Sequence, residues 1–489
     1  MPMLPPSSSP VRSPGWGATV ARRQTRWVGG FPLTPNAEEE GAMQRKLVQH
    51  VMLGMALTAS LVLAGCDGGG DDGRTSPGPQ PKGNIAISGF TGAGNTASFD
   101  LGTVTNTSPG RYYFTDRNNA AVDAIDIATL TLIAQIKGTG ANAFSGCRNA
   151  AGAPVDCASA NGRRSGPNGI DPITATKIYA PDVDAVRVID TTTLTVTTSI
   201  TVGPLTGTGF PDTASARADE GCFDSDHNIY MVSTNNPNPP FASFIDTTTD
   251  TLIASVTWSG GPFDGAAGNE ACVYDHTTQS FLVNNDGTTA NPRGEVEVIP
   301  ASLITPFKAA PMAAGTSTTI NALGATVKRF PLPACDPTGL ALGPGNDIAV
   351  GCRPGGVGDL LTVLILDRTN GAILATLNAG GGDQIWYDPT SNRYANAASR
   401  WNSSGRVTVN GGACSATNPC TPNLILIDAA TRTVVAMLPT GNNAHTVAVD
   451  PVTGFVFMPY SSDTAPAGFQ RSPQFTGTAD GGVSVFTIR

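Results

Sequence analysis

The chain has 489 residues, a formal net charge of -9 and only 14% charged residues. Because phosphate binding needs a clustered basic surface, which this sequence does not show, we expect no nucleic-acid partner. The 57 glycines and 38 prolines, with abundant Thr, Val, Asp and Asn, indicate many short strands joined by turns and argue against long helices.

The N-terminal region is typical of an exported protein. Residues 1–42 are rich in Pro, Ser and Arg and lack apolar periodicity, so we interpret them as a disordered upstream extension that precedes a start at Met43. Residues 43–65 combine a basic start, an apolar run and small residues at the end, which is the pattern of a signal peptide. A transmembrane anchor is the alternative, but the apolar run is too short to span a bilayer comfortably.

The end of this segment, Leu63-Ala64-Gly65-Cys66, resembles the bacterial lipobox. The resemblance implies that Cys66 is lipidated and anchors the protein to the cell membrane or the outer membrane, facing the periplasm or the cell surface. Residues 66–83 are mostly Gly, Asp and Pro, which predicts a flexible tether. We expect the globular body at residues 84–489.

The body contains an internal repeat. Segments that begin at Tyr112, Ile178, Ile229 and Leu361 each contain a β-branched run, a V-x-x-I-D-like strand, a polar turn and an alternating strand that ends at Gly. A period of two within the strands and a fixed order of the strands are typical of propeller blades.

The repeat resembles the YVTN family of β-propeller proteins, which includes YncE-like proteins. In this chain, Tyr113-Phe114-Thr115-Asp116 followed by Ala124-Ile125-Asp126 is a close match to that pattern. The resemblance extends over nearly all of residues 84–489. It implies a propeller fold but says little about function, because such propellers do many unrelated jobs.

Counting the innermost strands predicts an all-β, seven-bladed β-propeller of four-stranded antiparallel blades. The expected blade starts lie near Thr96, Asn168, Glu220, Glu270, Asp336, Asp383 and His445. The last blade ends one strand early, so we expect residues Asn84 to Phe90 to supply its fourth strand and close the ring.

The loops that exceed the usual repeat length fall mainly on one face. Loops between blades and loops between the second and third strands of a blade share this face, which we call the top face. The expected top-face loops are residues 139–165, 204–215, 235–242, 286–293, 353–359, 400–422 and 461–481. Residues 301–324 are expected on the opposite face. Loops on a rigid scaffold are the usual place for function, so we expect the functional site on the top face.

Eight cysteines follow Cys66, and an even number in an exported protein favours disulfides. Sequence alone does not fix connectivity among eight cysteines, but the repeat register favours sequential pairs. The expected pairs are Cys147 with Cys157, Cys222 with Cys272, Cys335 with Cys352, and Cys414 with Cys420. Without a C-x-x-C spacing, a zinc ribbon or a c-type haem site is not supported.

Polar residues stand at the heads of successive inner strands, which line the axis. They are Asn168, Glu220, Glu270, Asp336, Asp383 and His445. If these side chains converge, they form a set of oxygen ligands suited to Ca²⁺ or a similar divalent cation. Their position is similar to that of the axial metal in lactonase-type propellers. The alternative is that they simply line a solvated tunnel.

Two functions therefore remain open at this stage. We expect a membrane-anchored monomer that binds a protein or another cell-envelope ligand through its top face. The alternative is a metal-dependent hydrolase or lyase of lactonase-like type, with Glu220, Glu270, Asp383 and His445 as ligands or acid and base groups.

Overall fold

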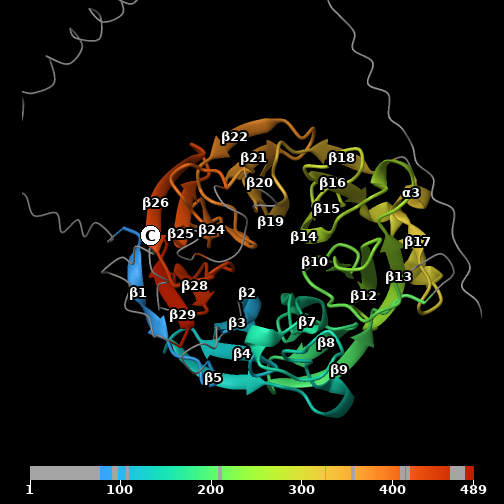
Figure 1. Ribbon diagram of the computed structural model, residues 1–489, viewed down its shortest axis with the longest axis horizontal. Coiled ribbons are helices and arrows are strands. Elements are labelled where there is room, and N and C mark those ends of the chain that lie inside the picture. Colours follow the sequence, from blue (N-terminus) through green and yellow to red (C-terminus); the bar gives the residue numbers. More distant parts are fainter. Residues whose placement is uncertain are drawn as a thin grey trace, which may run out of the picture. The chain divides into compact units, whose positions relative to one another are not determined.

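The computed structural model describes residues 78–90, 97–105, 110–206, 212–324, 326–353, 358–407, 414, 419–462 and 480–489. Its strands form seven antiparallel sheets arranged as blades around a central axis (Figure 1). The predicted all-β, seven-bladed propeller is confirmed. The expected upstream extension, signal peptide and lipidated Cys66 lie outside the described residues, as does most of the expected tether.

Each blade runs from an inner strand at the axis to an outer strand at the rim. Blades 1 to 4 contain β2 (Phe99–Thr105), β3 (Arg111–Asp116), β4 (Ala121–Asp126) and β5 (Thr131–Ile136); β6 (Asp171–Thr174), β7 (Lys177–Asp182), β8 (Ala185–Asp190) and β9 (Thr195–Thr201); β10 (Gly221–Asp224), β11 (Ile229–Thr234), β12 (Phe241–Asp246) and β13 (Thr251–Thr257); β14 (Asn269–Asp275), β15 (Ser280–Asn285), β16 (Glu295–Pro300) and β18 (Lys328–Pro331). Blades 5 to 7 contain β19 (Pro337–Leu342), β20 (Asp347–Cys352), β21 (Val363–Asp367) and β22 (Ile373–Leu377); β23 (Ile385–Asp388), β24 (Arg393–Ala398), β25 (Asn423–Asp428) and β26 (Thr433–Pro439); β27 (Ala448–Val449), β28 (Phe455–Tyr460), β29 (Gly482–Thr487) and β1 (Gln80–Ile85).

The turn between the third and fourth strands has the same local chemistry in several blades. In blade 1, the Asp126 carboxylate accepts a hydrogen bond from the Thr129 backbone N–H at 2.8 Å, and Leu130 then takes a left-handed conformation with φ of 55°. Asp residues that close turns in this way are favoured because the carboxylate replaces a backbone acceptor. Equivalent contacts are made by Asp190, Asp246, Asp367 and Asp428. The Asp-containing turn of the repeat is therefore the hairpin that leads to the rim.

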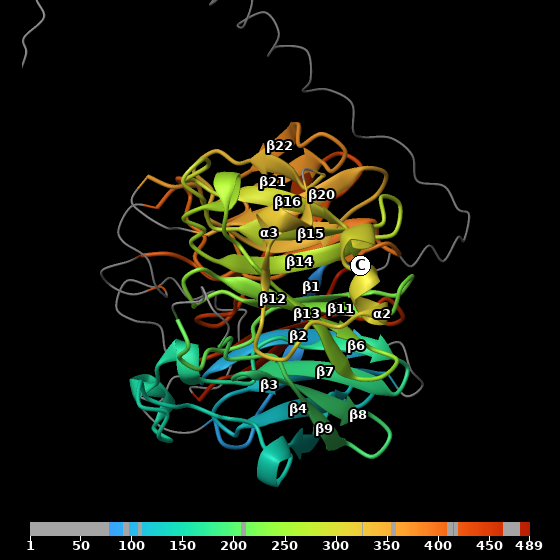
Figure 2. The ribbon, with the colours of Figure 1, turned by 90° about the vertical axis from the view of Figure 1, so that its right-hand side faces the viewer.

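The hydrophobic core lies between neighbouring blades, which stack around the ring (Figure 2). Between blades 3 and 4, buried Met231 and Phe244 pack in one cluster with Phe281. Between the first and last blades, the rings of Tyr112 and Phe457 stack with their centroids 4.6 Å apart. Each blade thus hides its apolar faces only against its neighbours.

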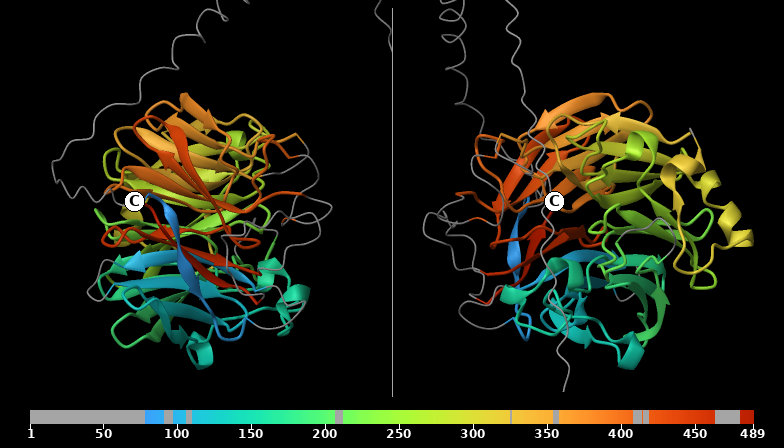
Figure 3. Two further views of the ribbon diagram at one scale, coloured as in Figure 1. Left: turned by 90° about the vertical axis from the view of Figure 1, so that its left-hand side faces the viewer. Right: turned by 45° about the vertical axis from the view of Figure 1, so that its right-hand side comes forward.

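The N-terminal strand closes the ring, as expected, but the prediction of its position was right only at Asn84 and Ile85. Strand β1 pairs antiparallel with β29 from Gln80↔Thr487 to Ile85↔Val483, so it lies earlier in the chain than the expected Asn84 to Phe90 (Figure 3). Backbone pairing at the rim does not require apolar side chains, and most of β1 is exposed or half-buried. The apolar signal comes instead from Ile87 and Phe90, which are buried after the chain has left the sheet. The ordered body therefore begins before residue 84.

The prediction for residues 301–324 was right only for the first part of the insertion, where Lys308 donates a hydrogen bond at 2.8 Å to the carbonyl oxygen of His227 in the turn between β10 and β11, on the face opposite the top face. This insertion forms η5 (Ala301–Leu303), α2 (Pro306–Ala309), β17 (Thr318–Thr319) and α3 (Ile320–Leu323) along the outer edge of blade 3 (Figure 3). Strand β17 adds to this sheet in parallel with β13. Ile304 and Ile320 are buried in the core between blades 3 and 4, and this burial draws the insertion onto the rim.

Four disulfides join the expected pairs, Cys147–Cys157, Cys222–Cys272, Cys335–Cys352 and Cys414–Cys420. The second of these links the neighbouring inner strands β10 and β14, with a Cα–Cα distance of 5.5 Å. Disulfides of this number are typical of exported domains. In the described part of the chain, helices are too short or too polar to cross a membrane.

Candidate functional site

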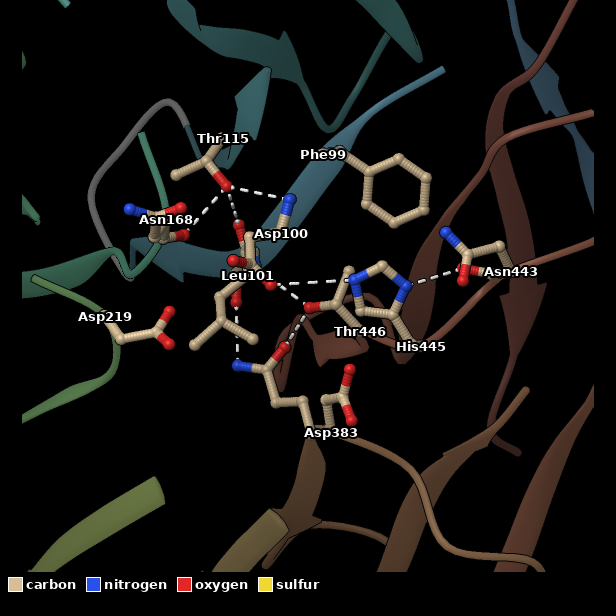
Figure 4. A network of polar contacts seen from close by, with 12 residues as sticks. Phe99, Asp100, Leu101, Thr115, Asn168, Asp219, Asp383, Asn443, His445 and Thr446 are labelled. Carbon is tan, nitrogen blue, oxygen red and sulfur yellow. Dashed lines mark hydrogen bonds and ion pairs between the residues drawn. The ribbon is translucent and has the colours of Figure 1, made fainter. Parts of the chain in front are cut away.

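The inner strands bring charged side chains from distant parts of the sequence to the axis. The six residues predicted at the strand heads all lie there. Glu220 and Asp336 directly precede inner strands, and Glu270 lies at the start of β14. Asn168, Asp383 and His445 stand two or three residues before inner strands. They are joined by Asp100, Arg117, Arg217, Asp219, Asn235, Asp286, Arg353 and Arg400, and we call the whole set the axial cluster. Figure 4 shows Asp100, Asp219 and Asp383, from blades 1, 3 and 6, gathered around one space.

Arg353 lies among three of the predicted carboxylates. Its guanidinium nitrogens are 3.7 Å from Glu270 Oε1, 3.9 Å from Asp383 Oδ1 and 4.0 Å from Asp336 Oδ2. These distances allow attraction but exceed a hydrogen bond. The Arg353 side chain is 31% exposed, so solvent reaches this part of the cluster.

This arrangement does not fit a divalent cation. Calcium needs six to eight oxygen ligands at about 2.3–2.6 Å. Among the described residues, no three His, Cys, Asp or Glu side chains come together as a metal site. The positive Arg353 side chain occupies the position between Glu270, Asp336 and Asp383 that a metal would need. The residues predicted to bind Ca²⁺ therefore do not form a set of calcium ligands in the described part of the chain, and the lactonase-like alternative stays a prediction.

His445 belongs to an interaction between the last and first blades. Its Nδ1 lies 2.6 Å from the Asn443 carbonyl oxygen, and its Nε2 lies 3.6 Å from Asp100 Oδ1 (Figure 4). Its ring stacks on Phe99 with the centroids 4.7 Å apart. Burial alone would lower the pKa of His445, but the Asp100 and Asp383 carboxylates outweigh burial and raise it. His445 therefore links the last and first blades, with a partner at each ring nitrogen.

Asn168 has a similar positioning role. Its Oδ1 accepts hydrogen bonds from Arg117 Nε at 3.0 Å and Nη2 at 2.6 Å, and its Nδ2 donates to the Ala218 carbonyl oxygen at 3.0 Å. Arg117 also pairs with Asp100. Although burial would raise the pKa of Asp100, Arg117 and His445 hold that pKa below its usual range. This side of the axial cluster is therefore internally paired.

The side formed by blades 3 and 4 is different, because carboxylates crowd there. Asp219 Oδ2 pairs with Arg217 at 2.7 Å and accepts a hydrogen bond from Asn235 Nδ2 at 2.8 Å. Asn235 Nδ2 also donates to Glu270 Oε1 at 3.1 Å. Glu220 is 7% exposed, and burial and the carboxylates of Glu270 and Asp219 raise its pKa well above the usual range.

Sequence reasoning missed the arginines and Asp286, although a positional signal exists. Arg117, Asn235, Asp286 and Arg353 each directly follow the second strand of a blade, and Arg400 stands one residue further on. That position lies beside the head of an inner strand and repeats around the ring. Reading it together with the strand heads would have shown that arginines as well as carboxylates reach the axis.

No protein-family model and no curated protein matches the chain. Among solved structures, the chain is similar to one titled Kuenenia stuttgartiensis hydrazine synthase, with a TM-score of 0.50 and 12% identity over 77% of this chain and 96% of that chain. It is also similar to the WD40 repeats of RRP9, with a TM-score of 0.49 and 8% identity over 82% of this chain and 96% of that chain. The first likeness supports the fold alone. Fold and site together define the class: a seven-bladed β-propeller with a charged axial cluster.

Proposed function

We propose that this protein is a lipid-anchored, extracytoplasmic binding module of the YVTN/YncE-like kind, and that its ligand docks on the top face at the axial cluster. The observation that carries the proposal is the solvent-reached group of charges around Arg353, assembled from several blades. Rigid strands fix these side chains, and pre-positioned charges give a binding site its specificity. The propeller fold and the four disulfides agree with a binding module in an oxidising compartment.

The test is capture of cell-envelope components by the immobilised full chain. Proteins, polysaccharides and peptidoglycan fragments of the envelope are offered to the wild type, to Arg353→Ala and to His276→Ala. His276 lies in the turn between β14 and β15 on the opposite face, where it contacts Asp226. We expect a component that binds the wild type and His276→Ala equally and that Arg353→Ala loses. Capture of nothing, or equal capture by all three proteins, would contradict the proposal.

A further inference from the structure

On the side formed by blades 3 and 4, the axial cluster contains buried hydrogen-bond acceptors that lack donors. The Glu220 carboxyl group makes no hydrogen bond or ion pair with any residue that the structure describes, and although only 7% of the residue is exposed, its oxygens are not among the fully buried ones. Asp286, which directly follows β15, has a buried Oδ1 without a hydrogen-bond partner. Buried polar atoms normally have partners, so the Asp286 oxygen requires an explanation.

Asn235 supplies an independent observation of the same kind. Its Nδ2 bridges Asp219 and Glu270, which fixes the orientation of the amide, because the opposite orientation would place its oxygen against two carboxylates. Its Oδ1 is consequently left without a donor, and the residue is only 5% exposed. This neutral acceptor adds to the need for N–H donors at the same place.

The balance of charges on this side also favours a positively charged ligand. Four acidic groups lie on this side, Asp219, Glu220, Glu270 and Asp286, and the cations that act on them are Arg217, Arg353 and Arg117, of which Arg117 is paired with Asp100. Arg217 is engaged by Asp219, and Arg353 is shared with Asp336 and Asp383 across the axis. A ligand that brings both positive charge and N–H donors would satisfy the excess.

We propose that Glu220, Asn235 and Asp286 bind the ammonium group of an amine ligand. An alkylammonium ion has three N–H donors and no acceptor, which is what acceptors without donors require. Hydrogen bonds between an ammonium group and a carboxylate are among the strong ones in proteins. This inference rests on the proposed binding function and names the chemistry of the ligand. A small free amine and a lysine side chain share that chemistry.

Proton release gives the site a measurable signature. Burial and the Asp336 carboxylate raise the pKa of Asp286 to about 7, and burial with the Glu270 and Asp219 carboxylates raises that of Glu220. At pH 7 the site therefore holds protons when no ligand is bound. An ammonium ion favours the ionised carboxylates, so its binding expels protons into the buffer.

The experiment is calorimetric titration of the full chain at pH 7 with 1,4-diaminobutane and, separately, with Nα-acetyllysine methylamide. Titrations are run in phosphate and in HEPES, because neither buffer is a primary amine and their ionisation enthalpies differ. We expect binding of at least one probe, with a heat that differs between the buffers according to the protons released. The tighter probe identifies the source as free amine or lysine side chain.

The variants are Glu220→Gln and Asn235→Ser, with Asp428→Asn as the matched control. Asp428 is a half-buried carboxylate that accepts hydrogen bonds within its own turn, away from the axis. We expect each of the first two variants to weaken binding by about tenfold or more, equivalent to about 1.4 kcal/mol, and the control to leave it unchanged. Using two variants at different residues guards against a folding defect in either one.

Several results would overturn the inference. They are no binding of either probe, the same heat in both buffers, affinity unchanged in Glu220→Gln and Asn235→Ser, or equal binding of tetramethylammonium, which has no N–H donor. Binding of Ca²⁺ alone at these residues would overturn it as well. If the wild type still captures an envelope component that Arg353→Ala loses, the proposed binding function stands and only the inference that the ligand is an amine is refuted.

Discussion

The disulfide Cys222–Cys272 should contribute more to stability than any other in the chain, because it closes the longest loop. It spans 50 residues, whereas Cys414–Cys420 spans 6. In the chain-entropy model, these loops correspond to about 4 and about 2 kcal/mol of stabilisation, respectively. All four sulfur positions are buried, so alanine at either pair leaves a comparable small void. The difference between the two double variants should therefore be about 2 kcal/mol.

The assay is urea unfolding under non-reducing conditions, followed by intrinsic fluorescence and by circular dichroism. The proteins compared are the wild type, Cys222→Ala with Cys272→Ala, and Cys414→Ala with Cys420→Ala. We expect the first double variant to unfold at distinctly lower urea concentration than the second. If both variants lose the same stability, or if the second loses more, loop length does not govern the contribution of the disulfide between blades, and the reasoning is refuted.

Three further outcomes follow from the fold and the axial cluster. Phe90→Ala should cost about 3–5 kcal/mol of unfolding free energy, because the Phe90 side chain is buried beside Phe114 at the ring closure, and urea unfolding measures the loss. Because the pKa of Asp286 is raised to about 7, the unfolded chain loses this proton before the folded chain does, and the free energy of unfolding should fall as pH rises from about 4 to 7. In Asp286→Asn, the slope of this free energy against pH should be flatter by up to about 1.4 kcal/mol per pH unit. Because the pKa of His445 is raised, its stabilising contact with Asp100 should be present at low pH and fade as pH rises through that pKa, and His445→Ala should lose this dependence.

Each outcome has a control. Val452→Ala, at a residue that is 78% exposed, should leave stability unchanged, and a loss as large as that of Phe90→Ala would contradict the role of the closure. In the comparison with Asp286→Asn, a wild-type free energy of unfolding that stays constant or rises from pH 4 to pH 7 would contradict a raised pKa for Asp286. NMR titration of the His445 imidazole that gave a pKa below the usual histidine value would contradict its pairing with Asp100.

Local chemistry made the blades predictable. The Asp-containing turns depend on contacts between residues two or three positions apart, as between Asp126 and Thr129, so they are visible in the sequence. The disulfides followed from the same register, since Cys222 and Cys272 occupy equivalent positions on neighbouring inner strands. Contacts between distant residues could be predicted where the repeat places those residues at equivalent positions of neighbouring blades.

The parts that were missed depend on contacts that the repeat does not encode. The position of β1 is set by backbone pairing with β29, which a polar sequence makes as well as an apolar one. Whether the axial carboxylates meet a metal or an arginine depends on how far Arg353 reaches across the axis, and strand patterns do not report side-chain reach. The acceptors without donors at Glu220 and Asn235 likewise become visible only when the neighbouring blade is in place.

The pairing of β1 with β29 also sets an order of events during synthesis. Thr487, the partner of Gln80, lies 407 residues later in the chain. At ordinary translation rates of about 5–20 residues per second, that delay is about 20 to 80 s. A strand that stays unpaired for so long is a hazard for aggregation, and β1 begins with Gln, Pro, Lys and Gly, residues that discourage premature pairing. Its weak strand character, which misled the sequence prediction, suits a segment that must remain open until the last blade emerges.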